Sequence, residues 1–356
     1  MEKVVVGMSG GVDSAVCAYL LKQSGYDVIG LTLKSWVAAD GSESRCCEID
    51  DARAVCDVLD IPYYVRECTA QFKEKVTDPF MRDYINGITP NPCIVCNRYL
   101  KWEKMLEAAD DLGAAYIATG HYAFAEKLDN GRYSVRRADC RAKDQTYMLY
   151  MLTQEQLSRT LMPLGKLSKD EVRKIAAAAK LPVADKGDSQ EICFVPDDDH
   201  ARFIEENYEG EIPPEGNFVN EDGVVLGHHK GIFRYTIGQR KGLGLSLGVP
   251  MYVKYIDTDK NEVVLCEDEE LFGTTVICSC VNMMSIDGIK ENEQIRCTAR
   301  IRYHHKNEDA TASMTKDGML RLDFDRPVRA AAPGQSAVMY DSNGYVIGGG
   351  VITEAF

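Results

Sequence analysis

The sequence lacks any apolar run that approaches the roughly 20 residues needed to cross a membrane as a helix. It also lacks a recognisable export signal, because the first six residues lead directly into a strand-like segment. We therefore expect a soluble, cytoplasmic protein that makes no membrane contact. The chain has 356 residues, more than the roughly 250–300 that a single core accommodates, so two or three domains are expected.

The thirteen cysteines do not form the pattern of a secreted disulfide scaffold. Their number is odd and the chain is long, whereas disulfide frameworks are typical of short exported chains with an even count. Cys17 and Cys56 lie within apolar helical patterns, where a thiol packs as a small hydrophobic side chain. The adjacent Cys46 and Cys47 are interpreted as a loop pair, because adjacent thiols rarely bind one metal. Most of the cysteines are therefore expected to be structural.

The chain lacks a balance of charge, because its 41 Lys and Arg residues are outnumbered by 55 Asp and Glu residues and the formal net charge is −14. This excess of acidic residues disfavours general binding to nucleic acid. Three segments are nevertheless rich in basic residues: 132–143, 228–241 and 296–306. Local positive surface of this kind can contact a phosphate backbone while the acidic remainder limits non-specific binding. Each segment could equally be an ordinary solvated face, and the sequence leaves both interpretations open.

Short β-branched strands alternate with amphipathic helices in the first half of the chain. This alternation is typical of a parallel sheet with helices on both faces, whose ligands bind at the carboxyl ends of the strands. The expected strands are 4–6, 28–33, 62–65 and 116–119, and the expected helices are 15–23, 52–59 and 97–112.

Beyond about residue 208 the pattern changes to short alternating segments separated by turns. Residues 209–216 are rich in Pro, Gly and Glu and are interpreted as a linker, and a softer boundary lies near 271–275. The expected strands are 251–256, 262–266, 294–303, 319–324, 337–340 and 345–352. They indicate antiparallel β-structure, in one or two small barrels or sandwiches. We expect domains at 1–208, 209–273 and 274–356.

The strongest local motif is GMSGGVDS, residues 7–14, between the first expected strand and the first expected helix. Gly10 and Gly11 allow the backbone to approach an anion, and the helix N-terminus supplies free N–H groups. A Walker loop would need a lysine here, and the G-x-G-x-x-G dinucleotide motif is absent. The motif therefore predicts a different phosphate loop. Asp13 beside a triphosphate would require Mg²⁺.

Two cysteines stand in patterns that suit covalent chemistry. Cys96 ends the segment TPNPCIVC, and the next helix is expected to begin at Asn97. A thiol at a helix N-terminus has a lowered pKa and more thiolate at neutral pH, so Cys96 is a candidate nucleophile. Cys193 follows a polar turn in DSQEICFV.

The motif SGGVDS resembles the pyrophosphate loop of the ATP-pyrophosphatase (PP-loop) superfamily, whose members split ATP into AMP and pyrophosphate. Further blocks follow in order: CCEIDDARAVCDVLDIPYYV, TPNPCIVCN, ATGHYA, KDQTYMLY, DSQEICF, TIGQRKGLG, PGQSAV and GGGVI. Together they resemble the bacterial tRNA-specific 2-thiouridylases, the MnmA family, over essentially the full length. The resemblance implies a nucleotide-hydrolase-like α/β domain, a small, mostly β central domain and a C-terminal β-barrel that contacts tRNA.

The resemblance also implies roles for individual positions. Cys193 would receive sulfur as a persulfide, and Cys96 would act as nucleophile and close a disulfide with Cys193. ATP would contact Gly7, Met8, Ser9, Gly10, Gly11, Val12, Asp13 and Ser14, with Leu33 and Gly120 beside the adenine. The target base would face Asn91, Pro92 and Cys93, and other tRNA contacts would come from His121, Lys143, Asp144, Gln145, Arg302, Tyr303 and Gln335.

The implied reaction is thiolation at C2 of the wobble uridine. ATP, with Mg²⁺, would adenylate the base oxygen, and sulfur would then displace it as AMP. Releasing sulfur from a persulfide takes two electrons, so a second thiol is required. The implied partners are tRNAs for Glu, Gln and Lys and a sulfur donor such as a cysteine desulfurase or relay protein, and we expect a monomer.

Three alternatives remain open at this point. Many relatives carry Asp where this chain has Cys93, and the thiols Cys93, Cys96 and Cys193 could instead hold an iron–sulfur cluster for iron–sulfur-dependent thiolation. A different PP-loop synthetase that adenylates a small metabolite would explain SGGVDS but leave Cys96 and Cys193 without a role. A nucleotide-sensing metal protein would use the three thiols structurally.

Overall fold

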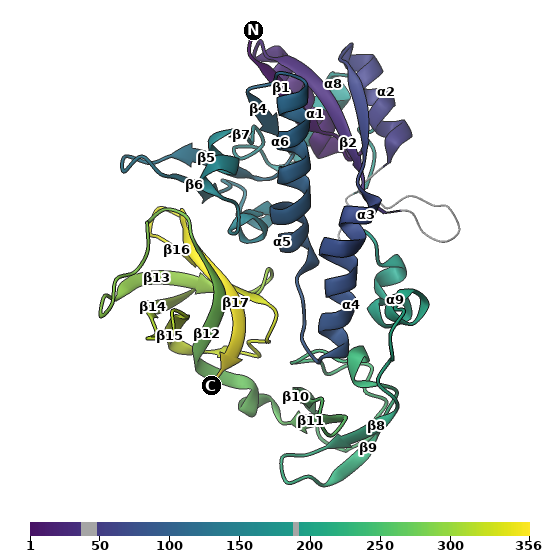
Figure 1. Ribbon diagram of the computed structural model, residues 1–356, viewed down its shortest axis with the longest axis vertical. Coiled ribbons are helices and arrows are strands. Elements are labelled where there is room, and N and C mark those ends of the chain that lie inside the picture. The colour runs from purple at the N-terminus through teal and green to yellow at the C-terminus, as the bar shows by residue number, and fades with distance from the viewer. Residues whose placement is uncertain (37–47, 188–191) are drawn as a thin grey trace.

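The computed structural model describes residues 1–36, 48–187 and 192–356, and the Cys46–Cys47 pair lies outside these ranges. Figure 1 shows an α/β part at the top, a small β-sheet at the bottom and a barrel beside the long helical segment that joins them. Within the described ranges, no helix has both the length and the apolar character that a membrane crossing requires.

The α/β part is built on a five-stranded sheet with the order β3-β2-β1-β4-β7, and each neighbouring pair is parallel. This confirms the predicted parallel sheet. Its strands are β1 (Lys3–Gly7), β2 (Asp27–Lys34), β3 (Tyr63–Glu67), β4 (Tyr116–Ala118) and β7 (Thr160–Leu161).

Helices cover both faces of this sheet. On β1, Val4 and Val6 pack into one hydrophobic cluster while Val5 packs into another, because successive side chains of a strand point to opposite faces. The first cluster includes α1 and α2, and the second includes α6. The helices are α1 (Val12–Gln23), α2 (Ile49–Leu59), α3 (Thr69–Phe72), α4 (Asp78–Ile85), α5 (Pro92–Cys96), α6 (Trp102–Asp111), α7 (Gln154–Ser158), α8 (Lys169–Ala178) and α9 (His200–Asn207).

The helix predicted to begin at Asn97 begins earlier, so that prediction was wrong. Asn91 caps α5 by accepting a hydrogen bond from the Ile94 N–H at 3.4 Å, and Pro92 occupies the first helical position. Asparagine at the cap and proline at the first position are both favoured there. The π-helical segment η2 (Asn97–Lys101) then joins α5 to α6. A second π-helical segment, η1 (Lys73–Thr77), joins α3 to α4.

The central sheet has the order β10-β11-β8-β9, with β8 (Gly216–Val219), β9 (Val225–His229), β10 (Tyr252–Asp257) and β11 (Glu262–Cys266). The pairing of β11 with β8 is parallel, which corrects the expectation of purely antiparallel structure in the second half.

The C-terminal strands form a closed antiparallel barrel in the order β12-β15-β14-β13-β16-β17, as expected for this part of the chain. Its strands are β12 (Phe272–Met283), β13 (Ile295–Arg300), β14 (Glu308–Met314), β15 (Leu320–Arg329), β16 (Ser336–Tyr340) and β17 (Val346–Ala355).

The barrel and the α/β part share one core. Val338 and Tyr340 from β16 pack in the same cluster as Trp102 and Tyr147 of the α/β part. The Tyr147 hydroxyl donates to the Ser336 carbonyl at 2.8 Å. A hairpin of β5 (Ala123–Lys127) and β6 (Tyr133–Arg137), which the sequence did not predict, also contacts the barrel through β17. The barrel is therefore fixed against the α/β part.

Candidate active site

The glycine-rich loop lies between β1 and α1, at the carboxyl end of the parallel sheet. Gly10 has φ +79°, a left-handed conformation that favours glycine. The Ser14 hydroxyl donates to the Gly11 carbonyl at 3.0 Å and lies 3.1 Å from the Ser9 hydroxyl. The Met8 and Val12 side chains are buried in the core, so only their backbone is available to a ligand. The loop thus presents two hydroxyls and free helix N–H groups to an anion.

The end of β4 approaches this loop closely at Gly120. A Cβ atom at this position would lie 2.7 Å from the Asp13 carbonyl carbon and 2.8 Å from the Ser14 nitrogen. Such a contact with backbone cannot be relieved by a side-chain rotation. Gly120, predicted to lie beside the adenine, is therefore required for the packing of the phosphate loop itself.

Asp13 contacts two side chains to which the sequence analysis gave no role, one of them a cation. The Lys169 ammonium lies 2.9 and 2.8 Å from its two carboxylate oxygens, and the Tyr122 hydroxyl donates to it at 2.7 Å. A protein cation thus compensates the charge of Asp13, and a contact of Asp13 with Mg²⁺ stays a prediction. Lys169 is the first residue of α8, directly after the Ser168 cap, and it had no motif of its own.

A second lysine borders the loop. The Lys186 ammonium donates to the Gly10 carbonyl at 3.2 Å and forms ion pairs with Glu48 and Asp51. Burial alone would lower the pKa of Lys186, but hydrogen bonds to Asp51 and Glu48 raise it above its usual value. This side chain therefore stays cationic beside the phosphate loop.

The two candidate catalytic thiols pack against one hydrophobic cluster. Cys96 is 6% exposed within it, and Cys193 is partly buried against the same group. The neighbouring Phe194 anchors the Cys193 segment, because its ring lies 5.2 Å from the rings of Phe80 and Phe203. The fold thus places two thiols that are far apart in sequence against the same hydrophobic cluster.

Leu33 connects these thiols with the nucleotide side of the sheet. It stands near the end of β2 and packs against the cluster that contains Cys96 and Cys193. Because β1 and β2 are parallel, the loop that follows β1 and the cluster that Leu33 contacts near the end of β2 lie around the same end of the sheet, while the contact of Leu33 with adenine stays a prediction.

Cys96 lies inside a helix, not at its N-terminus, so the predicted reason for a lowered pKa was wrong. Cys93 occupies the first turn of α5 and is half-buried. It lies near Tyr303 of the barrel: burial raises the pKa of Tyr303, and the acidic groups Asp144 and Cys93 raise it further.

Within the described ranges, no three His, Cys, Asp or Glu side chains are grouped closely enough to hold a metal ion. Cys93, Cys96 and Cys193 do not form such a group, and an iron–sulfur cluster on these three thiols stays a prediction.

The segment predicted to face the target base is positioned by the barrel. The Gln335 amide donates to the carbonyls of Thr89 and Pro90 at 3.1 and 3.2 Å. The Thr89 N–H donates to the Pro333 carbonyl at 2.9 Å. These bonds fix the chain just before Asn91 and Pro92.

Two of the predicted tRNA positions have structural roles. Asp144 is 3% exposed, and its carboxylate accepts from Arg137 at 3.1 Å and lies 3.6 Å from the Arg300 guanidinium. The Gln145 side-chain oxygen accepts from the Tyr122 N–H at 2.9 Å. Contact of either residue with RNA stays a prediction.

The remaining predicted tRNA positions are half-buried. His121 Nδ1 lies 2.9 Å from the Thr119 hydroxyl, and burial, with Lys101 nearby, lowers the pKa of His121 to about 3. It is therefore neutral near pH 7 and offers hydrogen bonding without charge. Lys143 ends a short 3₁₀ turn. Arg302 donates to the Arg329 carbonyl at 2.7 Å.

A strand, a glycine-rich loop without a Walker lysine and a helix follow one another at this site. This arrangement defines a nucleotide-binding domain of the PP-loop class. Comparison with known proteins agrees with this class and extends it to the whole chain. Residues 2–197 match the family model described as the tRNA methyl transferase HUP domain, 201–267 match the tRNA methyl transferase PRC-barrel domain, and 274–352 match the aminomethyltransferase beta-barrel domain.

Similar full-length proteins identify the family. The tRNA-specific 2-thiouridylase MnmA of Lachnoclostridium phytofermentans is 49% identical, with 99% of this chain and 100% of that protein covered. The enzyme of the same name from Clostridium beijerinckii is 50% identical over 99% of this chain and 98% of that protein. The chain therefore belongs to the MnmA family of tRNA-specific 2-thiouridylases.

Among solved structures, the U34-tRNA thiolase NcsA from Methanococcus maripaludis with its [4Fe-4S] cluster is 22% identical. The match covers 59% of this chain and 67% of that chain, with a TM-score of 0.35. A likeness of this size does not bear on how the present chain transfers sulfur.

Proposed function

We propose that the protein is an ATP-dependent tRNA-uridine 2-sulfurtransferase that acts on the wobble uridine. The observation that carries the proposal is the placement of Cys96 and Cys193 against one cluster, which Leu33 connects to the nucleotide end of the sheet. A synthetase for a small metabolite would need neither thiol, nor a barrel fixed against the base-facing segment.

The phosphate loop would bind the triphosphate of ATP through the backbone and hydroxyls of Ser9 and Ser14. The C2 oxygen of the uridine attacks the α-phosphorus, and pyrophosphate leaves. Lys186, beside the Gly10 carbonyl, offsets part of the negative charge that Glu48 and Asp51 bring near the leaving group. The product is an adenylated base whose C2 oxygen can depart as AMP.

Sulfur transfer then requires both thiols. The terminal sulfur of a Cys193 persulfide attacks C2, and AMP departs with the original oxygen. The Cys96 thiolate attacks the Cys193 sulfur, which breaks the persulfide bond and leaves the terminal sulfur on the base with its electron pair. The terminal sulfur is reduced, the two cysteines are oxidised to a disulfide, and a thiol reductant restores them for the next turnover.

The apolar surroundings of the two cysteines suit this step. The cluster of Phe72, Phe80, Phe194 and Phe203 excludes water from the persulfide, which would otherwise be lost to solvent nucleophiles or oxidants. A cysteine desulfurase or relay protein would charge Cys193, and Mg²⁺ would arrive with the ATP. We further propose tRNAs for Glu, Gln and Lys as substrates, a monomeric enzyme, and the division into 1–208, 209–273 and 274–356.

A single-turnover reaction tests the proposed function. Unmodified tRNA transcript, ATP and protein carrying a persulfide on Cys193 should yield 2-thiouridine, AMP and pyrophosphate in equal amounts. Nucleoside mass spectrometry distinguishes 2-thiouridine from a methylated uridine, which matters because two of the matching family models carry methyl transferase in their descriptions. Methyluridine, or AMP formation without thiolation, would refute the proposal.

A further inference from the structure

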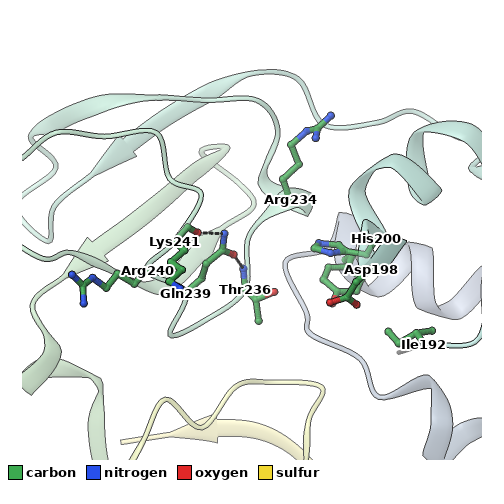
Figure 2. A pocket seen from close by; sticks show the side chains of 9 residues that line it. Ile192, Asp198, His200, Arg234, Thr236, Gln239, Arg240 and Lys241 are labelled. Carbon is green, nitrogen blue, oxygen red and sulfur yellow. Dashed lines mark hydrogen bonds between the residues drawn. The ribbon is translucent and has the colours of Figure 1, made fainter. Parts of the chain in front are cut away.

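A cavity of about 610 Å³ lies apart from the phosphate loop, between the central part and the helical segment. One wall is the loop of residues 236–241, and the opposite wall includes Ile192, Asp198 and His200 (Figure 2). Ile192 precedes the candidate persulfide cysteine, so the cavity adjoins the segment that carries Cys193. The lining includes three cationic side chains and one carboxylate, Arg234, Arg240, Lys241 and Asp198, and Arg234 is paired with Glu205 outside the lining.

The loop of residues 236–241 is held rigidly. The Gln239 side chain accepts from the Thr236 N–H at 3.0 Å and donates to the Lys241 carbonyl at 3.0 Å (Figure 2). Backbone bonds join Gly238 and Gln239 to Val253 of β10 at 2.8 and 3.0 Å. A loop fixed in this way presents its outer side chains at defined positions, which reduces the entropy lost when they bind a ligand.

Both cations of this loop lack a carboxylate partner in the described ranges, whereas most arginines of the other two basic segments have one. Arg240 and Lys241 are both exposed, and neither forms an ion pair within the described part of the chain. In segments 132–143 and 296–306, by contrast, arginines are engaged locally. The pairs are Arg132–Asp287, Arg136–Glu126, Arg137–Asp144, Arg296–Asp325 and Arg300–Asp144.

The same loop packs against the end of the barrel strand β15. A Cβ atom on Gly238 would lie 2.8 Å from the Ala330 Cβ and 3.5 Å from the Arg329 guanidinium. The Arg329 carbonyl accepts the hydrogen bond from Arg302, one of the predicted tRNA positions. The Arg329 guanidinium is itself paired with Asp268, so within the described ranges positive charge without a carboxylate partner lies at Arg302 and at Arg240 and Lys241 on the cavity rim, on a protein whose net charge is −14.

We infer that the loop of residues 236–241 binds the phosphate backbone of the tRNA, with Arg240 and Lys241 each contacting a phosphate at the cavity rim. The inference rests on the proposed function and extends the binding surface from the barrel to the central part. Seven of the nine residues that line the cavity are polar or charged, with Ile192 and Tyr84 as the apolar members, whereas a docking site for a donor protein would need apolar residues at its centre. Cations that project from a fixed backbone instead suit phosphate contacts, which position an RNA without reading its sequence.

The salt dependence of tRNA binding tests this inference. For the double variant Arg240→Ala/Lys241→Ala, the slope of log Kd against log salt should become shallower by about 1.4–1.8, since each lost phosphate contact removes about 0.7–0.9. The swap Arg240→Lys/Lys241→Arg keeps both charges and should retain the wild-type slope. The matched control Lys166→Ala/Lys174→Ala removes two exposed lysines at the α8 end of the molecule and should also leave the slope unchanged (Figure 1).

A wild-type slope in the Arg240→Ala/Lys241→Ala variant would overturn the inference. If that slope came with slower formation of persulfide on Cys193 from a cysteine desulfurase in the absence of tRNA, the cavity would be assigned to the donor protein instead. A failure of the proposed function is separate, because wild-type protein would then bind tRNA with a normal slope and form no 2-thiouridine.

Discussion

Asp13 brings a negative charge into the loop that receives a triphosphate, and Lys169 compensates it at 2.8–2.9 Å. In Lys169→Ala the Asp13 carboxylate would keep its hydrogen bond from Tyr122 but lose the lysine charge, so it would repel the nucleotide. We expect ATP affinity to fall at least about tenfold, because a charged hydrogen bond contributes about 1.5–3 kcal/mol. Isothermal titration with a non-hydrolysable ATP analogue measures this effect.

Two further variants separate charge from structure at this site. Lys166→Ala removes a nearby exposed lysine and should leave ATP affinity unchanged. Adding Asp13→Asn to Lys169→Ala should restore much of the lost affinity, since no uncompensated charge then remains. If the double variant binds ATP as weakly as Lys169→Ala, the charge explanation is wrong.

The half-buried His121 predicts a pH dependence of stability. Its pKa falls from 6.5 to about 3 in the folded state. The unfolded chain therefore takes up a proton below pH 6.5 that the folded chain does not, and stability falls as the pH drops toward 3 by up to about 1.4 kcal/mol per pH unit. In His121→Asn, urea unfolding should show a smaller loss of stability between pH 7 and pH 5. Equal losses in both proteins would contradict a neutral, half-buried His121.

Between elements, the close approach of the β4 end to the first turn of α1 depends on Gly120. In Gly120→Ala the added methyl group would displace the Asp13–Ser14 backbone, and such overpacking typically costs about 1–3 kcal/mol. We expect weaker ATP binding together with a lower Tm. At Gly288 a Cβ atom would meet no atom within 4 Å, so Gly288→Ala should change neither quantity. Wild-type ATP affinity in Gly120→Ala would show that the loop tolerates displacement.

The elements themselves were largely predictable where periodicity is strong. The β1 core Val4–Val6, the α1 helix and the strand β11 all follow from local patterns. The start of α5 was missed although Asn91 and Pro92 are a regular helix-start signal, because the helix was expected to begin only at Asn97. Strand β7 has only two residues and carries no periodicity of its own.

The candidate site was predictable only in part, for a physical reason. The loop and the thiols stand in local motifs, whereas Lys169 and Lys186 acquire their roles by tertiary contact with Asp13 and the Gly10 carbonyl. Strand β6 was interpreted only as part of a basic segment. Its pairing with β5, which brings Arg136 to Glu126, is a tertiary contact that no linear pattern specifies.

At the scale of the whole molecule, the barrel completes the core of the catalytic part. Val338, Tyr340 and Val346 are at most 1% exposed and pack with Trp102 and Tyr147. We expect the full chain to unfold with the barrel and the α/β part in one thermal transition, and residues 1–273 alone to aggregate because this apolar surface is uncovered. Differential scanning calorimetry of both proteins measures this. Two separate transitions, or a soluble and cooperatively folded 1–273, would show that the parts are independent.

The pairing of two remote thiols beside the nucleotide is tested most directly by mapping disulfides after one turnover. With sulfur loaded on Cys193, wild-type protein should form a Cys96–Cys193 disulfide in the same amount as 2-thiouridine, measured by mass spectrometry of non-reduced peptides. Cys96→Ser should bind ATP normally and form neither product. Cys68→Ala, which alters a 1% exposed thiol of the same cluster, should form both. Thiolation by Cys96→Ser, or 2-thiouridine without the disulfide in wild-type protein, would contradict the account.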